Sequence, residues 1–271
     1  MDVHISIAAE TLFNIGPIPV TNSMLTMFIV MAGILLAGWW IARRAQVIPG
    51  HAQGTVEVAI EFLLGLVEGT AGRKEGRRVF PLIGAIFIFI LIANYSGLLP
   101  GVGTIGKWET EDGEKVLVPF FRAPNADINM TLAMALVTFF LVQVRGISVN
   151  GFVGRIKHMA DPPALFPLEL IAEFSRIISL SARLFGNILA GEVLLAIMYT
   201  MANAIKIAVI PIFFPVIFLG LELLFGAIQA LVFALLTVVY VSLAASGHDD
   251  EHEEHGEEAH EIAQATASVG D

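Results

Sequence analysis

Residues 177–185 read Ile-Ile-Ser-Leu-Ser-Ala-Arg-Leu-Phe and place Arg183 inside a long apolar run. No carboxylate lies within eight residues of this arginine in either direction, and Glu192 is the only charged side chain between residues 188 and 200. A guanidinium at membrane depth costs from roughly 3 to more than 10 kcal/mol unless it faces water or a partner. Because such a group is not kept for packing, the stretch predicts a membrane helix that takes part in an ion or substrate pathway.

The composition places the whole chain in the membrane class. Its 271 residues are 56% hydrophobic and 15% charged, with a mean hydropathy of +0.78, whereas soluble domains are about 45–50% apolar and about 25% charged. The absence of cysteine excludes a disulfide framework and a thiolate metal site. Basic residues are few and scattered, so we expect no nucleic-acid partner. No basic region precedes an apolar one at the start, so we expect no cleavable signal peptide.

Hydropathy and charge divide the chain into three parts. We predict an extramembrane N-terminal segment (1–22), a membrane domain (23–246) and an acidic, His-rich tail (247–271) that carries much of the net charge of −10. The tail histidines could bind metal ions, but the tail has no apolar periodicity, which favours a solvated, disordered segment. We therefore predict no metal site and no cofactor.

The membrane domain begins with three runs of ordinary spanning length, at residues 24–42, 79–99 and 128–144. Residues 54–69 differ, because Val, Ile and Leu recur there at helical spacing between glutamates. This pattern is typical of an amphipathic helix in the membrane interface or of a loop helix packed on protein. The segments 101–127 and 150–163 are polar and charged, so we predict exposed connections, with Asp127 and Asn129 as helix-capping candidates.

Two further apolar runs, 164–202 and 204–245, are too long for one ordinary crossing. As helices each would be about 60 Å long, about twice the thickness of the hydrocarbon layer. Either both helices are strongly tilted or each is bent, and Pro211 and Pro215 offer bending points in the second. We favour a long, tilted hairpin that turns near residues 203–206. The predicted fold is therefore all-α and polytopic, with about five membrane helices plus an interfacial helix.

The distribution of basic residues predicts the orientation of this multi-pass chain. With the N-terminus outside, nine basic residues lie on the cytoplasmic side: Arg43, Arg44, Arg73, Lys74, Arg77, Arg78, Arg145, Arg155 and Lys157. Four lie outside: Lys107, Lys115, Arg122 and Lys206. This excess fits the positive-inside rule and makes the C-terminus cytoplasmic. The chain has no internal repeat, which argues against the inverted repeats of many secondary transporters.

Each of the two long runs carries a polar stripe. At 100° per residue, five side chains of the first run fall within about 80° of one another, namely Glu169, Arg176, Ser179, Arg183 and Asn187. Glu173 lies at the edge of that stripe, and Glu192 lies on the opposite side. On the second run Glu222, Gln229 and Tyr240 share a face. Polar side chains in membrane helices face a bundle interior or an aqueous cavity, so the two stripes are candidate partners.

The predicted depths of these side chains place acidic groups on both sides of Arg183, with Gln229 beside it. That arrangement suits two offset half-channels separated by a fixed positive charge. Structural alternatives remain for several residues. Arg176 could snorkel or pair with Glu173 or Glu169, Gln229 could supply only an interhelical hydrogen bond, and Glu222 could be structural. Arg183 cannot lose its proton to escape the penalty, so a structural role is least expected there.

Residues 179–192, Ser-Leu-Ser-Ala-Arg-Leu-Phe-Gly-Asn-Ile-Leu-Ala-Gly-Glu, resemble the signature of the a subunit of F-type ATP synthases. Further matches follow at residues 94–100, 124–136 and 229–240, and the resemblance covers roughly residues 20–246. It implies that Arg183 faces the carboxylates of a rotating c-ring, with Gln229 next to it and Asn187 beside the ring path.

The same resemblance implies roles for the remaining polar residues. Glu192 and Glu222 would line an outer half-channel, and Glu169 with Glu173 an inner one. Arg176 and Tyr240 complete the predicted proton-translocation set. Position 222 is a histidine in some family members, and the long acidic tail departs from the usual short ending.

The resemblance also implies partners and a location. The c-ring, the peripheral-stalk b subunits and other synthase subunits would surround the chain in the lipid bilayer of a bacterial plasma (inner) membrane, or of an organelle as the alternative. No phosphate-binding loop of the Gly-x4-Gly-Lys type is present, so the chain is not an enzyme by itself. The sequence leaves open whether the ion is H⁺ or Na⁺. A stand-alone secondary cation/proton transporter is the alternative function.

Overall fold

The computed structural model describes residues 9–46, 50–111, 114–159, 166–204 and 210–245. Five of its helices are long and apolar enough to cross a membrane. They are α1 (Asn22–Arg43), α2 (His51–Ser96), α3 (Ile128–Met159), α4 (Phe166–Ala204) and α5 (Ile210–Ala245). The predicted all-α polytopic architecture is confirmed. The acidic tail and part of the predicted turn at 203–206 lie outside the described residues.

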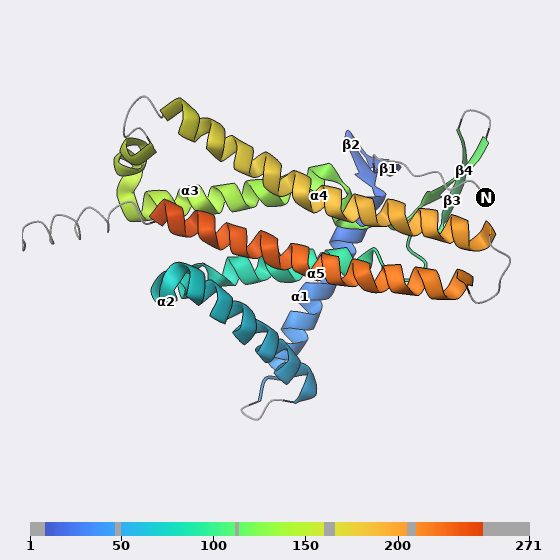
Figure 1. The fold of residues 1–271 in the computed structure, drawn as a ribbon, viewed down its shortest axis with the longest axis horizontal. Helices are drawn as coiled ribbons and strands as arrows, with labels where there is room; N and C mark the ends of the chain where they lie inside the picture. The colour runs from blue at the N-terminus through green and yellow to red at the C-terminus, as the bar shows by residue number, and fades with distance from the viewer. Residues whose placement is uncertain (1–8, 47–49, 112–113, 160–165, 205–209, 246–271) are drawn as a thin grey trace, which may run out of the picture.

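Two small β-hairpins occupy segments that the sequence predicted only as extramembrane. β1 (Thr11–Ile15) pairs with β2 (Ile18–Thr21), and β3 (Gly106–Glu111) pairs with β4 (Glu114–Pro119), both antiparallel. A short 3₁₀ helix, η1 (Pro124–Ala126), follows. Figure 1 places the second hairpin near the end of the molecule where α4 passes into α5. These hairpins satisfy the backbone of the connections without adding a sheet to the membrane domain.

A glycine with a positive φ angle divides α2 into two helical parts. Gly72 has φ 74° and ψ 159°, a conformation that a residue with a side chain rarely adopts. The part before it corresponds to the predicted interfacial helix, and the part after it contains the predicted second span. That span begins earlier than its apolar run because the basic residues 73–78 are already helical.

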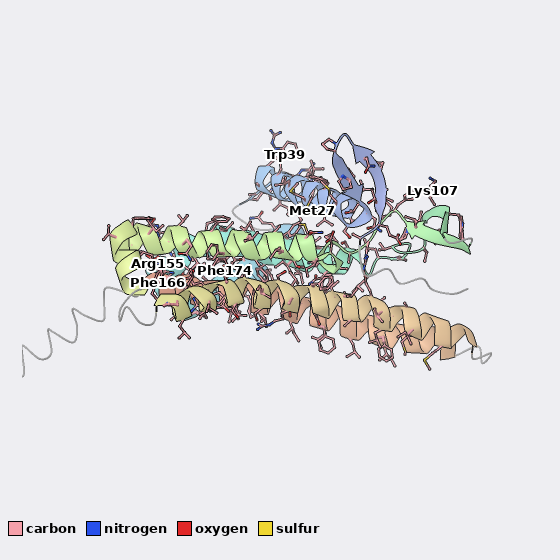
Figure 2. All side chains as sticks on the ribbon, turned by 90° about the horizontal axis from the view of Figure 1, so that it is seen from above. Met27, Trp39, Lys107, Arg155, Phe166 and Phe174 are labelled. Carbon is pink, nitrogen blue, oxygen red and sulfur yellow. The ribbon has the colours of Figure 1, made fainter. Side chains whose placement is uncertain are left out.

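Gly151 divides α3 in the same way, with φ 73° and ψ 165°. The segment from Phe152 to Met159 is helical rather than irregular. Phe152 and Val153 are exposed, as the prediction of an exposed connection required, but Arg155 is buried, and there the prediction was wrong. Arg155 is buried in this short return segment and lies beside the start of α4 (Figure 2). The segment looked solvated because it is charged, but Arg155 forms an ion pair with Glu173 inside the protein.

α4 and α5 are continuous over 39 and 36 residues, about 58 and 54 Å at 1.5 Å per residue. α5 passes through Pro215 without leaving helical backbone angles, and Pro211 lies in its first turn, where proline is tolerated. Each therefore reaches this length as one continuous helix without a break. Figure 1 shows the two side by side, with α1 running across their direction.

The core lies where α2, α3, α4 and α5 meet. One cluster joins residues of α2, α3 and α5, and a second adds α4 through Ile177, Leu180 and Leu184 against Ala230 and Phe233 of α5. The opposite surfaces of α4 and α5 expose large apolar side chains, including Ile178, Leu224 and Ile228. A surface of this kind suits lipid or other membrane subunits rather than water.

Candidate ion-translocation site

Arg183 lies on an open flank of α4. The helix buries Leu180, Leu184 and Ile188 at the spacing of one helical face, which leaves the neighbouring Arg183 exposed. Among the residues that the structure describes, its guanidinium forms neither an ion pair nor a hydrogen bond. Ser181, on the packed side, shares a 3.0 Å hydrogen bond with Thr131 of α3. The apolar face of α4 therefore packs against α3 and α5, and Arg183 lies on a side of α4 that these helices leave exposed.

Gln229 is buried on α5 near the same packing cluster. Its neighbour Ala230 packs with Leu184, and within the described part of the chain its Nε2 atom has no hydrogen-bond partner. No hydrogen bond joins it to Arg183. Asn187, one turn beyond Arg183, is half-buried and likewise makes no hydrogen bond in the described residues. In the described residues, the amide nitrogen of Gln229 and the side chain of Asn187 therefore make no hydrogen bond within the chain.

Three motif regions that lie far apart in the sequence meet beside Gln229. Asn94 Nδ2 donates to the carbonyl oxygen of Gly226 at 3.0 Å, and Asn125 Nδ2 donates to Asn94 Oδ1 at 2.7 Å. Asp127 caps α3 as the sequence suggested, because its Oδ1 atom accepts from the backbone N–H of Asn129 at 2.9 Å. These contacts position α5 against α2 and η1.

Towards the turn between α4 and α5 lies a group that we call the turn-end cluster: Arg122, Gly191, Glu192 and Glu222. The carboxylate of Glu222 fits against Gly191, where an added Cβ atom would lie 1.8 Å from its Oε1. Glu192 accepts hydrogen bonds from Nε and Nη2 of Arg122, both at 3.2 Å. The structure therefore brings Glu192 and Glu222 close together, and the role in one half-channel that the resemblance implied for both stays a prediction.

Arg122 is the residue of this cluster that the sequence reasoning missed. It was counted only as an outside charge, yet it is buried, and its backbone N–H donates to Thr26 Oγ1 of α1 at 3.2 Å. The signal was its setting, since Arg122 follows Pro-Phe-Phe and precedes the motif at 124–136. Arginine is almost never fully buried unless it is paired, which agrees with the contact to Glu192.

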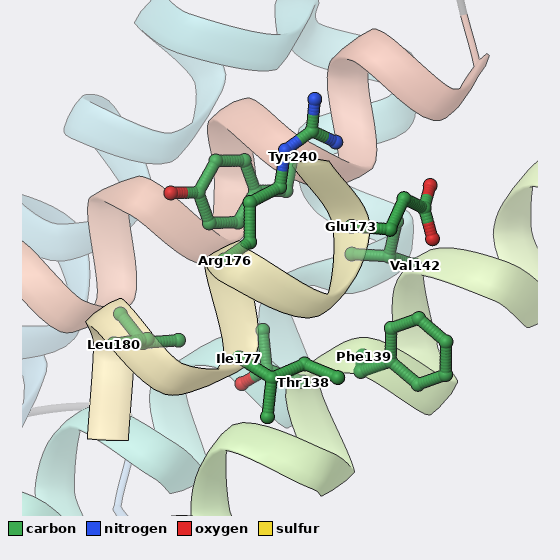
Figure 3. Close-up of a pocket in the computed structure, with 8 residues that line it drawn as sticks. All are labelled: Thr138, Phe139, Val142, Glu173, Arg176, Ile177, Leu180 and Tyr240. Atoms are coloured by element: carbon green, nitrogen blue, oxygen red, sulfur yellow. The ribbon is translucent and has the colours of Figure 1, made fainter. Parts of the chain in front are cut away.

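The other end, where α4 begins and α5 stops, holds the open-end cluster: Gln143, Arg155, Glu169, Glu173, Arg176 and Tyr240. Arg176 pairs with Glu169 at 3.6 Å and lies over the Tyr240 ring, 5.3 Å from its centroid (Figure 3). Of the alternatives that the sequence left open, the pair with Glu169 is the one that forms. A pocket of about 20 Å³ beside them has mostly apolar walls.

Glu173 is held from α3 instead. Arg155 Nη2 donates to its Oε1 at 2.7 Å, and Gln143 donates to its Oε2. Neither Arg155 nor Gln143 was among the predicted site residues. Their partner lies 18 or 30 residues away along the chain, so no helical periodicity could have revealed the contact.

The antiparallel pairing of α4 with α5 orders these groups along the two helices. Arg176 meets Tyr240, Leu184 packs with Ala230, and Gly191 meets Glu222. Arg183 lies about 10 Å along the helix axis from each flanking polar contact, at 1.5 Å per residue. A lone arginine thus separates two clusters that each contain their own ion pairs.

This arrangement is typical of membrane proteins that move ions, because an intramembrane charge such as Arg183, which has no partner in the described parts of the chain, is a candidate for a transport path. Residues 24–242 match the family described as the ATP synthase A chain. The chain is 38% identical over 239 residues to "ATP synthase subunit a" of Moorella thermoacetica, covering 88% of this chain and 96% of the relative. It is 35% identical over 249 residues to "ATP synthase subunit a" of Gloeobacter violaceus, covering 92% and 94%. The chain belongs to the ATP synthase A chain family.

Proposed function

We propose that this chain is the proton-conducting stator subunit of an F-type ATP synthase, a non-catalytic membrane subunit that works with the other synthase subunits. The observation that carries the proposal is Arg183, exposed on a helix of membrane-spanning type and without a partner in the described residues. A permanent cation in that position must face water or a negative charge that the described residues do not supply. The carboxylates of a c-ring are the chemistry that answers it.

In this proposal the turn-end cluster forms the outer half-channel, with Glu192 and Glu222 as its carboxylates and Asn187 beside it. The inner half-channel begins at Glu169, with Arg176 and Tyr240 alongside. Protons enter by one route, neutralise a ring carboxylate, travel with the ring and leave by the other. Glu173 also belonged to the predicted inner set, but it is buried in an ion pair with Arg155.

Arg183 makes the proton leave at the right place. Two opposite unit charges 4 Å apart gain about 4 kcal/mol at an effective dielectric constant near 20. That energy corresponds to about a thousandfold change in the proton affinity of a facing carboxylate. A ring carboxylate that approaches Arg183 is therefore held ionised, and the same charge blocks direct leakage between the half-channels. Gln229 can supply an amide beside the passing carboxylate.

Each proton brings about 2.3 kcal/mol per 100 mV of membrane potential, so several protons must pass for each ATP. The exposed apolar side chains of α4 and α5 support a ring contact on the Arg183 side. The sparsely covered α1 leaves room for lipid and for the peripheral-stalk b subunits. We place the N-terminus outside and the C-terminus in the cytoplasm of a bacterial cell, with the chain in the inner membrane.

The test is ATP-driven proton pumping in membrane vesicles that contain the whole synthase with Arg183→Ala. Pumping and ATP synthesis should both be lost, because ring carboxylates would no longer be driven to ionise. Arg77→Ala is the matched control, since Arg77 is an exposed arginine outside α4 and α5. The proposal fails if assembled complexes carrying Arg183→Ala pump and synthesise at the level of the control.

A further inference from the structure

Two glutamates one helical turn apart near the start of α4 have opposite surroundings. The Glu169 side chain is 42% exposed, and its partner Arg176 is also partly exposed. The Glu173 side chain is only 5% exposed, and its partner Arg155 is equally buried. Both oxygens of Glu173 accept hydrogen bonds, one from Arg155 and one from Gln143. One carboxylate is open to its surroundings, and the other is enclosed.

The backbone of α3 builds this enclosure with two glycines. Gly151 adopts a positive φ angle and turns the last part of the helix back towards α4. Gly146 then leaves the space that the returning arginine fills, because an added Cβ atom would lie 2.9 Å from Arg155 Nε and 3.0 Å from its Cδ. The arginine reaches Glu173 only because both positions lack a side chain.

On the side of α5, Glu173 borders a small pocket of about 20 Å³. Its walls are mostly apolar, and its polar lining residues are Glu173, Arg176, Thr138 and Tyr240 (Figure 3). To take up a proton, Glu173 would have to give up bonds to a guanidinium and an amide inside the protein. Removing one partner of such a buried pair is strongly unfavourable.

We infer that Arg155 is a positioning residue that withholds Glu173 from the proton path, so that protons leave the inner half-channel through Glu169. The inference rests on the proposed function and narrows the inner half-channel to one of its two predicted carboxylates. Glu169 qualifies because its ion pair is partly exposed, and an exposed pair is weak and exchanges readily. The two glutamates carry the same charge, and they differ in that the partner of Glu173 is buried whereas the partner of Glu169 is partly exposed.

The first comparison uses single variants in whole synthase complexes. Passive proton flux through the membrane sector, measured in vesicles stripped of the catalytic sector, should fall several-fold with Glu169→Gln. Glu173→Gln should lower it much less, because the proposal takes Glu173 out of the proton path. The amount of assembled complex in each membrane is measured alongside, so that flux is compared per complex.

The decisive experiment is a rescue. Arg155→Gln, introduced into the Glu169→Gln variant, should restore part of the lost flux because Glu173 is released to carry protons. Adding Glu173→Gln to that double variant should remove the restored flux. A purely structural role for Arg155 predicts further loss at the first step and no dependence on Glu173 at the second.

A second rescue variant replaces no charged residue. Gly146→Ala adds a Cβ atom where Arg155 now lies, so the guanidinium must move away, and it too should restore flux to Glu169→Gln. Gly154→Ala is the matched control in the same segment, since its Cβ atom would meet only Asn150 Cβ at an ordinary 3.5 Å. It should leave the flux of the Glu169→Gln variant unchanged.

The inference is overturned if Glu173→Gln lowers flux per complex as much as Glu169→Gln. It is also overturned if neither Arg155→Gln nor Gly146→Ala restores flux. Failure of the proposed function has a separate signature, which is pumping that survives Arg183→Ala. Loss of pumping with Arg183→Ala and no rescue would reject the role of Arg155 while leaving the stator function intact.

Discussion

The turn-end and open-end clusters contain similar residues that are held in different ways. At the turn end, the ion pair of Arg122 with Glu192 leaves Glu222 without an ion pair in the described residues. At the open end, each of the two glutamates has an arginine of its own. Within the parts described, the turn-end cluster therefore has one carboxylate more than it has arginines, whereas the open-end cluster is balanced. A carboxylate without a cation partner leaves a local negative charge, which raises the local concentration of cations such as protons.

The two clusters also differ in what supports them. Arg122 comes from the connection before α3, which is tied to α1 through Thr26. Arg155 comes from the end of α3 itself, folded back at Gly151. The turn-end cluster thus depends on a loop, and the open-end cluster depends on a helix. Changes that remove these supports should therefore have unequal effects on thermal stability and on proton flux.

The largest expected effect is the loss of stability when the buried ion pair of Arg155 with Glu173 is broken. Arg155→Ala leaves Glu173 buried with one partner fewer, and breaking a buried ion pair from one side destabilises a protein by about 3–5 kcal/mol. The thermal stability of the purified complex should fall accordingly. Replacing both partners, with Arg155→Met and Glu173→Leu, should recover most of the loss, since a well-packed apolar pair is often as stable. Equal losses in the single and double variants would show that the pair is not what holds α3 to α4.

A smaller effect is expected at the loop-supported pair. Arg122 and Glu192 share charge-assisted hydrogen bonds that leave the glutamate partly exposed, and such bonds contribute about 1.5–3 kcal/mol. A double-mutant cycle with Arg122→Gln and Glu192→Gln, read by thermal stability, should give a coupling energy in that range. The coupling should be below the loss found for Arg155→Ala. A coupling near zero would mean that the loop is placed by its contacts with α1 alone.

How much of these clusters the sequence could predict depends on where each partner comes from. The spans, the two long helices, the Asp127 cap and the Glu169 to Arg176 alternative all follow from local spacing. Helical periodicity brings residues three, four or seven apart onto one face, and that is enough for such contacts. The adjacent positions of Glu192 and Glu222 came from the family resemblance, which encodes the antiparallel register of α4 and α5.

The rest could not be predicted because it depends on tertiary contacts. Arg122 and Glu192 are 70 residues apart, and nothing local marks them as partners. Arg155 lies in a charged stretch that looks solvent-exposed in the sequence. The positive φ angle of Gly151 turns this stretch back towards α4, where Arg155 is buried. The two hairpins were missed because short polar strands in connections carry little apolar alternation. In each case a residue or segment that reads as solvated is fixed by a distant part of the chain.

A subtler change tests whether the excess carboxylate at the turn end is placed by packing. Gly191→Ala puts a Cβ atom 1.8 Å from Glu222 Oε1, so the glutamate must turn away. Passive proton flux per complex should fall a few-fold, approaching the loss caused by Glu222→Gln. Gly220→Ala on α5 is the control, because its Cβ atom would meet nothing within 4 Å in this chain. If Gly191→Ala conducts like Gly220→Ala, the contact does not position Glu222.

The smallest effect belongs to an ion pair outside both clusters. Arg77 pairs with Glu68 across the Gly72 kink, and its side chain is 57% exposed. Exposed pairs contribute about 0.2–1 kcal/mol, because water already solvates both charges and salt screens them. Arg77→Ala should therefore lower the thermal stability of the complex only slightly, and added salt should remove even that difference. The enclosed Arg155 pair should keep its contribution in the same salt, since buried pairs are screened much less. If both pairs respond equally to salt, the enclosure of Glu173 is open to water and the contrast between the two clusters disappears.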